Sequence, residues 1–145
     1  MAARTVRKVL GKPEAEKNFE MEFMGAQLLA QCGQRGDAAQ AAKKAAAALP
    51  GNADPAISKE LARMLQEGGL VAEAEQQLNA YLRVRGRDAD AWMQMALAKD
   101  ALGDSYAAQN AIRQAYQIDP NAAAERLRAS EQLQRVAAPL FRRRQ

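Results

Sequence analysis

Few side chains in this sequence could perform covalent or acid–base chemistry. The chain has one cysteine, Cys32, and no histidine. A Cys–His dyad and a Cys/His zinc site both need more than this, so both are excluded. Because no base is present to activate its thiol, Cys32 is predicted to be a small packing residue, with a redox or modification site as the alternative.

The carboxylates form no pair suited to general acid–base catalysis. Glu14 and Glu16, like Glu73 and Glu75, are two residues apart, so their side chains would point to different sides of a helix. The pair Gly68–Gly69 lacks the lysine and the hydroxyl residue that follow in a phosphate-binding loop. The sequence therefore predicts no catalytic residue, no cofactor, no metal site and no small-molecule substrate.

Basic residues are concentrated at both ends of the chain, whose formal net charge is +4. They are Arg4, Arg7, Lys8 and Lys12 at one end and Arg142, Arg143 and Arg144 at the other. Clustered cations can bind nucleic acid or an anionic membrane surface. The chain has few aromatic residues on which bases could stack, however, which disfavours nucleic acid. We expect solvated ends, with an anionic membrane surface as the alternative.

The composition favours one helical domain. With 145 residues the chain is long enough for a single core, and alanine dominates its apolar residues. Residues that favour β-strands are few. The fold predicted from composition is all-α.

The compartment is left open by the sequence. No apolar run approaches the roughly 20 residues that cross a bilayer, and the basic segment 1–13 lacks the apolar run of a secretory signal. A chain with one cysteine suits a reducing compartment, so a soluble protein of the cytoplasm is favoured over one of the periplasm. Whether the chain is part of a longer protein, and its oligomeric state, are not indicated.

Large and small residues recur along the chain with a helix-turn-helix period. The pattern in the third unit is Trp92, Met95, Ala96, Gly103, Ala108, Ile112, Ala115 and Pro120. A shift of 34 residues gives Ser58, Leu61, Ala62, Gly69, Ala74, Leu78 and Tyr81, and a further shift of 33 gives Gly25, Leu28, Leu29, Gly36, Ala41, Ala45 and Ala48. The sequence thus predicts three repeated units.

These units predict the positions of the helices. The expected helices are 14–33, 37–49, 55–67, 71–85, 90–102 and 105–118, followed by a capping helix 122–138 that starts after Asn121. Leu133, Val136 and Leu140 share one face of that last helix. The predicted repeats are 22–54, 55–88 and 89–121, within a domain 14–138 between the basic segment 1–13 and a basic tail 139–145.

The third unit resembles the tetratricopeptide repeat. Its aromatic start is Trp92, followed by Met95 and Ala96 and later by Ala108, Ile112 and Pro120, and the Asp-Pro-Asn sequence 119–121 closes it. Lys99 and Gly86 depart from the family pattern. The resemblance implies a right-handed superhelix of antiparallel helix pairs with a C-terminal cap, and it implies that the chain binds another protein.

In this family the first helix of each unit lines a concave groove. The residues so placed are Phe23, Ala26, Gln27 and Ala30, then Lys59, Arg63 and Gln66, then Met93, Gln94 and Leu97, with Arg128 on the cap. The resemblance implies a positive site at Lys59 and Arg63 for a peptide that carries an acidic group. The alternative is that these are ordinary solvated side chains.

The sequence as a whole predicts a non-enzymatic scaffold or adaptor that binds a peptide or a partner protein in the concave groove. Two alternatives remain. In the first, the chain is the soluble end of a larger membrane-anchored protein with a structural or assembly role. In the second, it is an RNA-binding helical repeat. The sequence names neither the partner nor the pathway.

Overall fold

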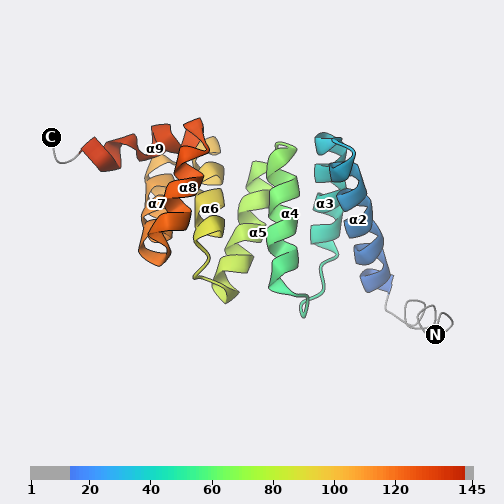
Figure 1. The fold of residues 1–145 in the computed structure, drawn as a ribbon. Coiled ribbons are helices and arrows are strands. Elements are labelled where there is room, and N and C mark those ends of the chain that lie inside the picture. Colours follow the sequence, from blue (N-terminus) through green and yellow to red (C-terminus); the bar gives the residue numbers. More distant parts are fainter. Residues whose placement is uncertain (1–13, 143–145) are drawn as a thin grey trace.

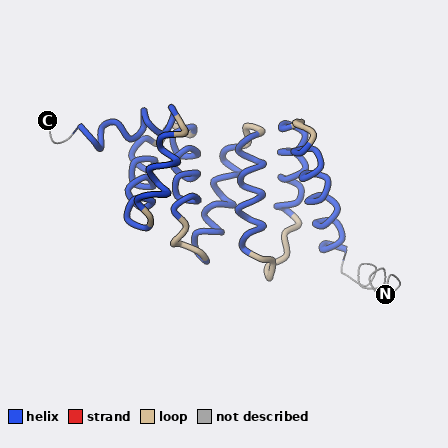
Figure 2. Tube along the Cα trace, viewed as in Figure 1, coloured by secondary structure: helices blue, strands red, loops and turns tan. Residues whose placement is uncertain are grey.

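The computed structural model describes residues 14–142, and every regular element within that range is a helix. The elements are α2 (Glu14–Gln31), α3 (Arg35–Ala47), α4 (Pro55–Glu67), α5 (Val71–Val84), α6 (Ala89–Ala101), α7 (Ser105–Ile118), α8 (Pro120–Arg128) and α9 (Glu131–Arg142). Successive helices stand side by side in a row from one end of the molecule to the other (Figures 1 and 2). The predicted all-α solenoid of helix pairs is confirmed.

Each of the three repeated helix pairs, α2/α3, α4/α5 and α6/α7, turns at a glycine with positive φ. Gly33, Gly69 and Gly103 have φ angles of 80°, 90° and 87°, a conformation that glycine adopts without the steric cost of a Cβ atom. Gly36 was expected to be the first turn glycine, but it lies inside α3. The first turn therefore comes three residues earlier than the sequence pattern indicated.

This difference changes the register of the whole first unit. The turn glycines are spaced by 36 and 34 residues, because the connection 48–54 between α3 and α4 is longer than the connection 85–88 between α5 and α6. The three repeat positions of α3 are filled by Ala38, Ala42 and Ala45, all buried. The sequence pattern assigns the same three positions to Ala41, Ala45 and Ala48. The buried three correspond to Ala74, Leu78 and Tyr81 in the second unit and to Ala108, Ile112 and Ala115 in the third.

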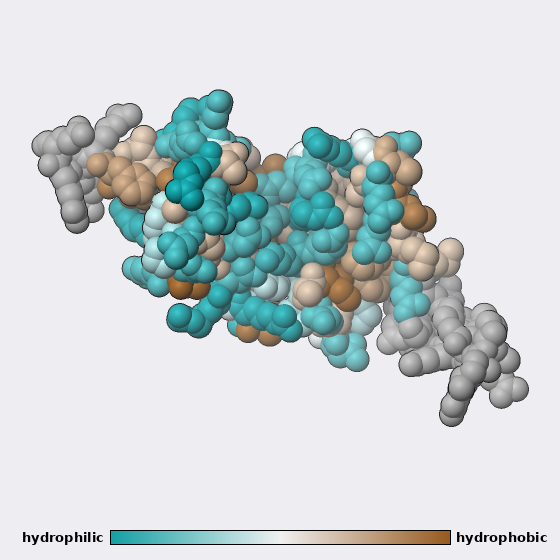
Figure 3. Space-filling model, viewed as in Figure 1, coloured by the Kyte–Doolittle hydropathy of each residue, from teal (hydrophilic) through white to brown (hydrophobic). Residues whose placement is uncertain are grey.

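Large side chains fill the core between helices that approach one another at small ones. The largest fully buried residues are Leu61, Met64, Leu65, Leu78, Met93, Ile112 and Leu133. Ala96 and Ala108 have no exposed surface, and such small residues let α6 and α7 pack closely. Polar side chains cover most of the face shown in Figure 3.

Aspartates begin four of the helices. The carboxylates of Asp54, Asp88, Asp104 and Asp119 accept hydrogen bonds from the first-turn N–H groups of α4, α6, α7 and α8. The predicted cap at Asp54 ahead of Pro55 is confirmed. Asp119, not Asn121, caps α8, and Pro120 starts that helix, where its missing N–H costs nothing.

The expected single capping helix is two helices. Residues 129 and 130 separate α8 from α9, and the Ser130 hydroxyl accepts a hydrogen bond from the Leu133 N–H at 3.2 Å. Leu133 and Val136 are buried and Leu140 packs against the core, as the apolar spacing predicted. The basic segment 1–13 and the arginines 143 and 144 lie outside the described residues.

Candidate binding groove

A groove of about 390 Å³ lies between α4, α6 and α8. Its lining residues are Ala56, Lys59, Glu60, Arg63, Gln66 and Glu67 from α4, Asp90, Gln94 and Leu97 from α6, and Arg126 from α8. The first helices of the second and third units thus meet the cap at one concave site. No helix between residues 14 and 142 is both long and apolar enough to cross a membrane.

Five of the expected groove residues are brought together here. Lys59 and Arg63 lie one turn apart on α4, and Gln94 and Leu97 lie across from them on α6. This placement follows from helical spacing, because residues three or four apart share a face. Gln66, one turn further along α4, joins the same wall.

Six expected residues do not line this groove. Met93 is 0% exposed and packs in the core. It precedes Gln94 by one residue, so its side chain points to a different side of α6 from the side that lines the groove. Arg128 is exposed on α8 two residues from Arg126, and two residues span about half a helical turn, so Arg126 lines the groove in its place. The other four, Phe23, Ala26, Gln27 and Ala30, lie on α2, which contributes no lining residue.

Sequence reasoning missed the acids that share the groove with these cations. Glu60, Glu67 and Asp90 were not among the expected groove residues, and all three line the groove. The spacing of Glu60 and Glu67 from Arg63, by three and four residues, is a signal for ion pairs within one helix. The pairing of Asp90 with Lys59 and Arg126 depends on tertiary packing, and the sequence carries no comparable signal for it.

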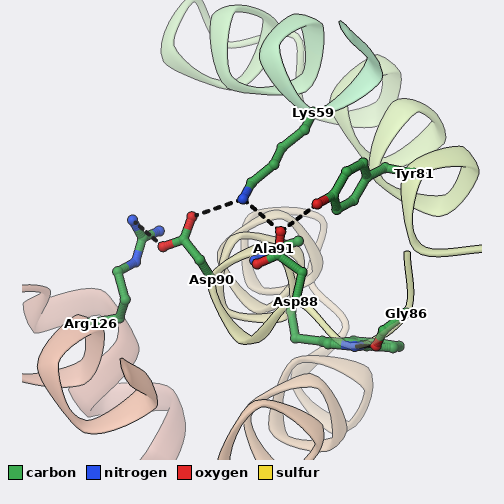
Figure 4. A network of polar contacts seen from close by, with 8 residues as sticks. Lys59, Tyr81, Gly86, Asp88, Asp90, Ala91 and Arg126 are labelled. Atoms are coloured by element: carbon green, nitrogen blue, oxygen red, sulfur yellow. Dashed lines mark hydrogen bonds and ion pairs between the residues drawn. The ribbon is translucent and has the colours of Figure 1, made fainter. Parts of the chain in front are cut away.

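A polar network joins the second unit, the third unit and the cap at one end of the groove (Figure 4). The Lys59 ammonium group lies 2.7 Å from Oδ2 of Asp88 and 3.6 Å from Oδ2 of Asp90. The Tyr81 hydroxyl donates to Asp88 at 2.5 Å, and Arg126 lies 3.1 Å from Asp90. The ammonium group also lies 5.5 Å from the centre of the Tyr81 ring, which adds a cation–π contact.

The contacts of this network stabilise its charged forms. Burial by itself raises the pKa of Asp88, but hydrogen bonds from Lys59, Tyr81 and the Ala91 N–H outweigh it and hold that pKa below its ordinary value. Burial by itself lowers the pKa of Lys59, but the hydrogen bond to Asp88 and the charges of Asp88 and Asp90 raise it above its ordinary value. Both groups are therefore ionised at neutral pH.

Arg63 is paired within its own helix. Its guanidinium group forms ion pairs with Glu60 and, at 2.9 Å, with Glu67. The hydrogen bond to Glu60, more than any other contact, raises the pKa of Arg63. The lining therefore holds three cations and three carboxylates, and each cation is within 4.0 Å of at least one of those carboxylates.

Two side-chain amides add uncharged polar atoms to the groove. Gln94 lines it although the residue is only 8% exposed. The Oε1 atom of Gln66 is buried and accepts no hydrogen bond from the described residues. An amide offers both donors and an acceptor, as a peptide backbone does, and buried polar atoms ordinarily find a partner.

The remaining chemical candidates are outside the groove. Cys32 was expected to pack in the interior, but it is exposed. The shift of the first unit explains this difference, because Cys32 corresponds to Gly68 at the turn and not to the buried Leu65. Within residues 14–142, no three His, Cys, Asp or Glu residues are grouped so that they could hold a metal ion.

Comparison with known proteins shows what this fold is similar to. No protein-family model and no curated protein sequence matches the chain. Among solved structures, a crystal structure of MamA matches with a TM-score of 0.65 at 18% identity, over 95% of this chain and 74% of that chain. A second structure, "MamA RS-1 ArsTM double mutant", matches with a TM-score of 0.58 at 18% identity, over 88% of this chain and 77% of that chain. The chain therefore shares the all-helical solenoid fold of the MamA structures.

Proposed function

We propose that this chain is a non-enzymatic scaffold of the tetratricopeptide type, whose groove between α4, α6 and α8 binds a segment of a partner protein. The observation that supports this most directly is the pair of amides, Gln94 and Gln66, on a concave wall beside Leu97. Amides can hydrogen-bond to a peptide backbone, and the apolar floor can cover side chains of the bound segment. The solenoid of helix pairs, a fold shared with MamA, agrees with this role because stacked repeats form an extended concave surface.

The charge balance of the groove favours a bound segment without net charge. An acidic side chain could reach Arg63 only by displacing Glu60 or Glu67, and it could reach Lys59 only beside Asp88 and Asp90. Exchanging a carboxylate of the chain for a carboxylate of the ligand gains little Coulomb energy, because the cations of the groove already pair with carboxylates of the chain. The proposed ligand therefore has apolar and amide side chains, and the acidic peptide implied by the family resemblance is the alternative.

The partner can be identified and mapped in one series of experiments. Wild-type protein and the double variant Lys59→Glu/Arg63→Glu are used to isolate binding proteins from the native lysate, which mass spectrometry then identifies. A protein recovered only with the wild type is titrated by calorimetry against both forms. We expect micromolar affinity for the wild type and at least about tenfold weaker binding for the variant.

A matched variant separates the two ligand classes. Glu60→Gln/Glu67→Gln releases Arg63 from both of its carboxylates, so it should strengthen binding of an acidic segment and leave binding of a neutral one nearly unchanged. Binding that survives the Lys59 and Arg63 changes, but is lost when residues 142–144 are removed, would place the function on the basic tail. The RNA-binding alternative receives no support from this groove, because its three cations are balanced by three acids.

A further inference from the structure

The outer side of α2 carries an exposed apolar stripe. Met21, Met24 and Leu28 are 74%, 61% and 57% exposed. Their spacing of three and four residues places them on one side of the helix, while Phe19 and Ala26 on the opposite side are buried in the core. Figure 3 shows hydrophobic surface at the end of the molecule where α2 lies. A contiguous patch of this kind often marks an interaction site.

In the second unit the corresponding face is covered by a helix. The spacing of 36 residues places Met21, Leu28 and Cys32 at the positions of Ile57, Met64 and Gly68. Met64 is buried, and a Cβ atom at Gly68 would lie 2.2 Å from the Cβ atom of Ala39 and 2.6 Å from the carbonyl oxygen of Arg35. Helix α3 therefore lies directly on this side of α4.

The third unit repeats this arrangement. Ala91 and Ala98 stand at the positions of Ile57 and Met64, and both are fully buried where α5 packs against α6. The positions of Met21 and Leu28 thus lie on the stacking face of both later units, whereas Met24 corresponds to Glu60 and Gln94, which line the groove. A helix packs on the positions of Met21 and Leu28 twice in this molecule, so this part of α2 is suited to contact with another helix.

Helix α2 has features that suit pairing with another helix along its length. It has 18 residues, against 13 in α4 and in α6, so it is about 27 Å long. The spacing of Met21, Met24 and Leu28 is that of the seam of a coiled coil. Gly25 lies beside this seam, and no atom is within 4 Å of the place its Cβ would take, so another helix could approach closely there.

The distribution of charge along α2 favours an antiparallel copy of the same helix. The sequence of its first half contains four glutamates and Lys17, a formal net charge of −3, whereas residues 24–31 include no charged residue. Parallel pairing would set the two net-negative halves against one another. Antiparallel pairing sets the acidic half of one helix against the uncharged half of the other, and it also opposes the two helix dipoles.

We propose that two copies of this chain associate through α2, antiparallel about a two-fold axis near Met24 and Gly25. In this arrangement Met21 of one copy packs against Leu28 of the other, and the two Met24 side chains lie closest to the axis. Such an interface is self-complementary, as two-fold symmetry requires. Because α2 contributes nothing to the groove, the dimer presents two grooves and could bind a partner with two copies of the recognised segment more tightly.

Sedimentation velocity of the full chain tests the proposal. One helix from each copy makes a small interface, so we expect a reversible dimer with a Kd of about 10 to 100 µM, measured at protein concentrations from about 1 to about 300 µM. The variant Met24→Glu/Leu28→Glu should weaken association at least about tenfold. The control Leu102→Glu changes an exposed leucine in the turn between α6 and α7, and it should leave the dimer intact. Circular dichroism checks that both variants are folded.

Disulfide formation tests the geometry. In a Cys32→Ser background, Met24→Cys should form a covalent dimer on mild oxidation, whereas Tyr106→Cys, exposed at the start of α7, should not.

A monomer at every concentration, or association unchanged by Met24→Glu/Leu28→Glu, would overturn the proposal. Association abolished by Lys59→Glu/Arg63→Glu would show that one copy enters the groove of another, and association seen only after removal of residues 1–13 would show that these residues cover α2. Either result also overturns the proposed dimer. The proposed function is tested separately, by measuring partner binding to the groove variants.

Discussion

The ammonium group of Lys59 lies 2.7 Å from Oδ2 of Asp88, although the two residues are 29 positions apart in the sequence. The same carboxylate accepts a hydrogen bond from the Tyr81 hydroxyl and, through Oδ1, caps α6 at the Ala91 N–H. One aspartate thus joins α4, α5 and the start of α6. The second and third units are held together by this polar contact as well as by apolar packing.

Replacing Asp88 should destabilise the protein more than removing a cap alone. Asp88→Ala removes the cap, the ion pair with Lys59 and the partner of Tyr81, so we expect a loss of about 2 to 4 kcal/mol in the free energy of unfolding. Asp104→Ala is the matched control, because Asp104 caps α7 in the same way at 3.0 Å, and it should cost about 1 kcal/mol. Urea denaturation measures both, and equal losses would show that the Lys59 contact contributes nothing.

The same aspartate should make stability depend on pH in the acid range. Its folded pKa lies below the ordinary value of 3.8, so its contribution is present above that value and is lost as the pH falls through the folded pKa. The stability difference between wild type and Asp88→Asn should therefore shrink as the pH falls from about 5 to about 2. Thermal melting at several pH values measures this difference. A difference that stays constant would mean that the carboxylate has the same pKa in the folded and unfolded chain.

Gly68→Ala should be costly although Gly68 ends a helix. Its Cβ atom would collide with Ala39 and with the Arg35 carbonyl of α3, so α3 and α4 would have to separate at a cost of about 1 to 3 kcal/mol. Gly51→Ala is the control, because nothing lies within 4 Å of the Cβ atom it would add. Chemical denaturation of both variants tests the close approach of the two helices. A Gly68→Ala protein as stable as Gly51→Ala would contradict it.

Enlarging small residues at the seams tests the repeat register. Ala108 and Ala38 occupy equivalent buried positions, so leucine at either should cost about 1 to 3 kcal/mol by overpacking. Ala101 is exposed at the end of α6, and leucine there should be nearly neutral. Ala41→Leu, at a half-buried position, should cost less than Ala38→Leu. The reverse order for Ala41 and Ala38 in thermal melting would support the register read from the sequence over that of the structure.

The second and third units could be predicted because their residues differ in size. Leu78 and Ile112 are large residues that follow the small Ala74 and Ala108 by four positions. The turn glycines Gly69 and Gly103 mark the helix ends, so the positions can be matched one by one. In the first unit, the buried face of α3 consists only of alanines. An alanine-rich helix gives no size pattern from which its rotation can be read. The sequence pattern places the first turn at Gly36, whereas the structure has it at Gly33, and the longer connection 48–54 accounts for the difference.

The groove could be predicted only in part, because some of its residues are set by tertiary packing and not by helical spacing. Helical spacing places Lys59 and Arg63 on one face without knowledge of the neighbours. The choice of Arg126 over Arg128 depends on where α8 begins, and a one-residue change in that start rotates every side chain by about 100°. The balance of charge depends on Asp90, whose contacts with Lys59 and Arg126 join residues far apart in the sequence.

The alanine face of α3 also bears on how the molecule opens. Ala38, Ala42 and Ala45 bury less apolar area than the larger side chains at the matching positions of α5 and α7, so the first unit gains less from stacking than its neighbours do. In a solenoid, where each unit contacts only adjacent units, such a unit unfolds locally before the rest. Amide hydrogen exchange should accordingly be fastest in α2 and α3 among the paired helices. The groove would then keep its shape through these opening events, because α4, α6 and α8 stay folded while the first unit opens.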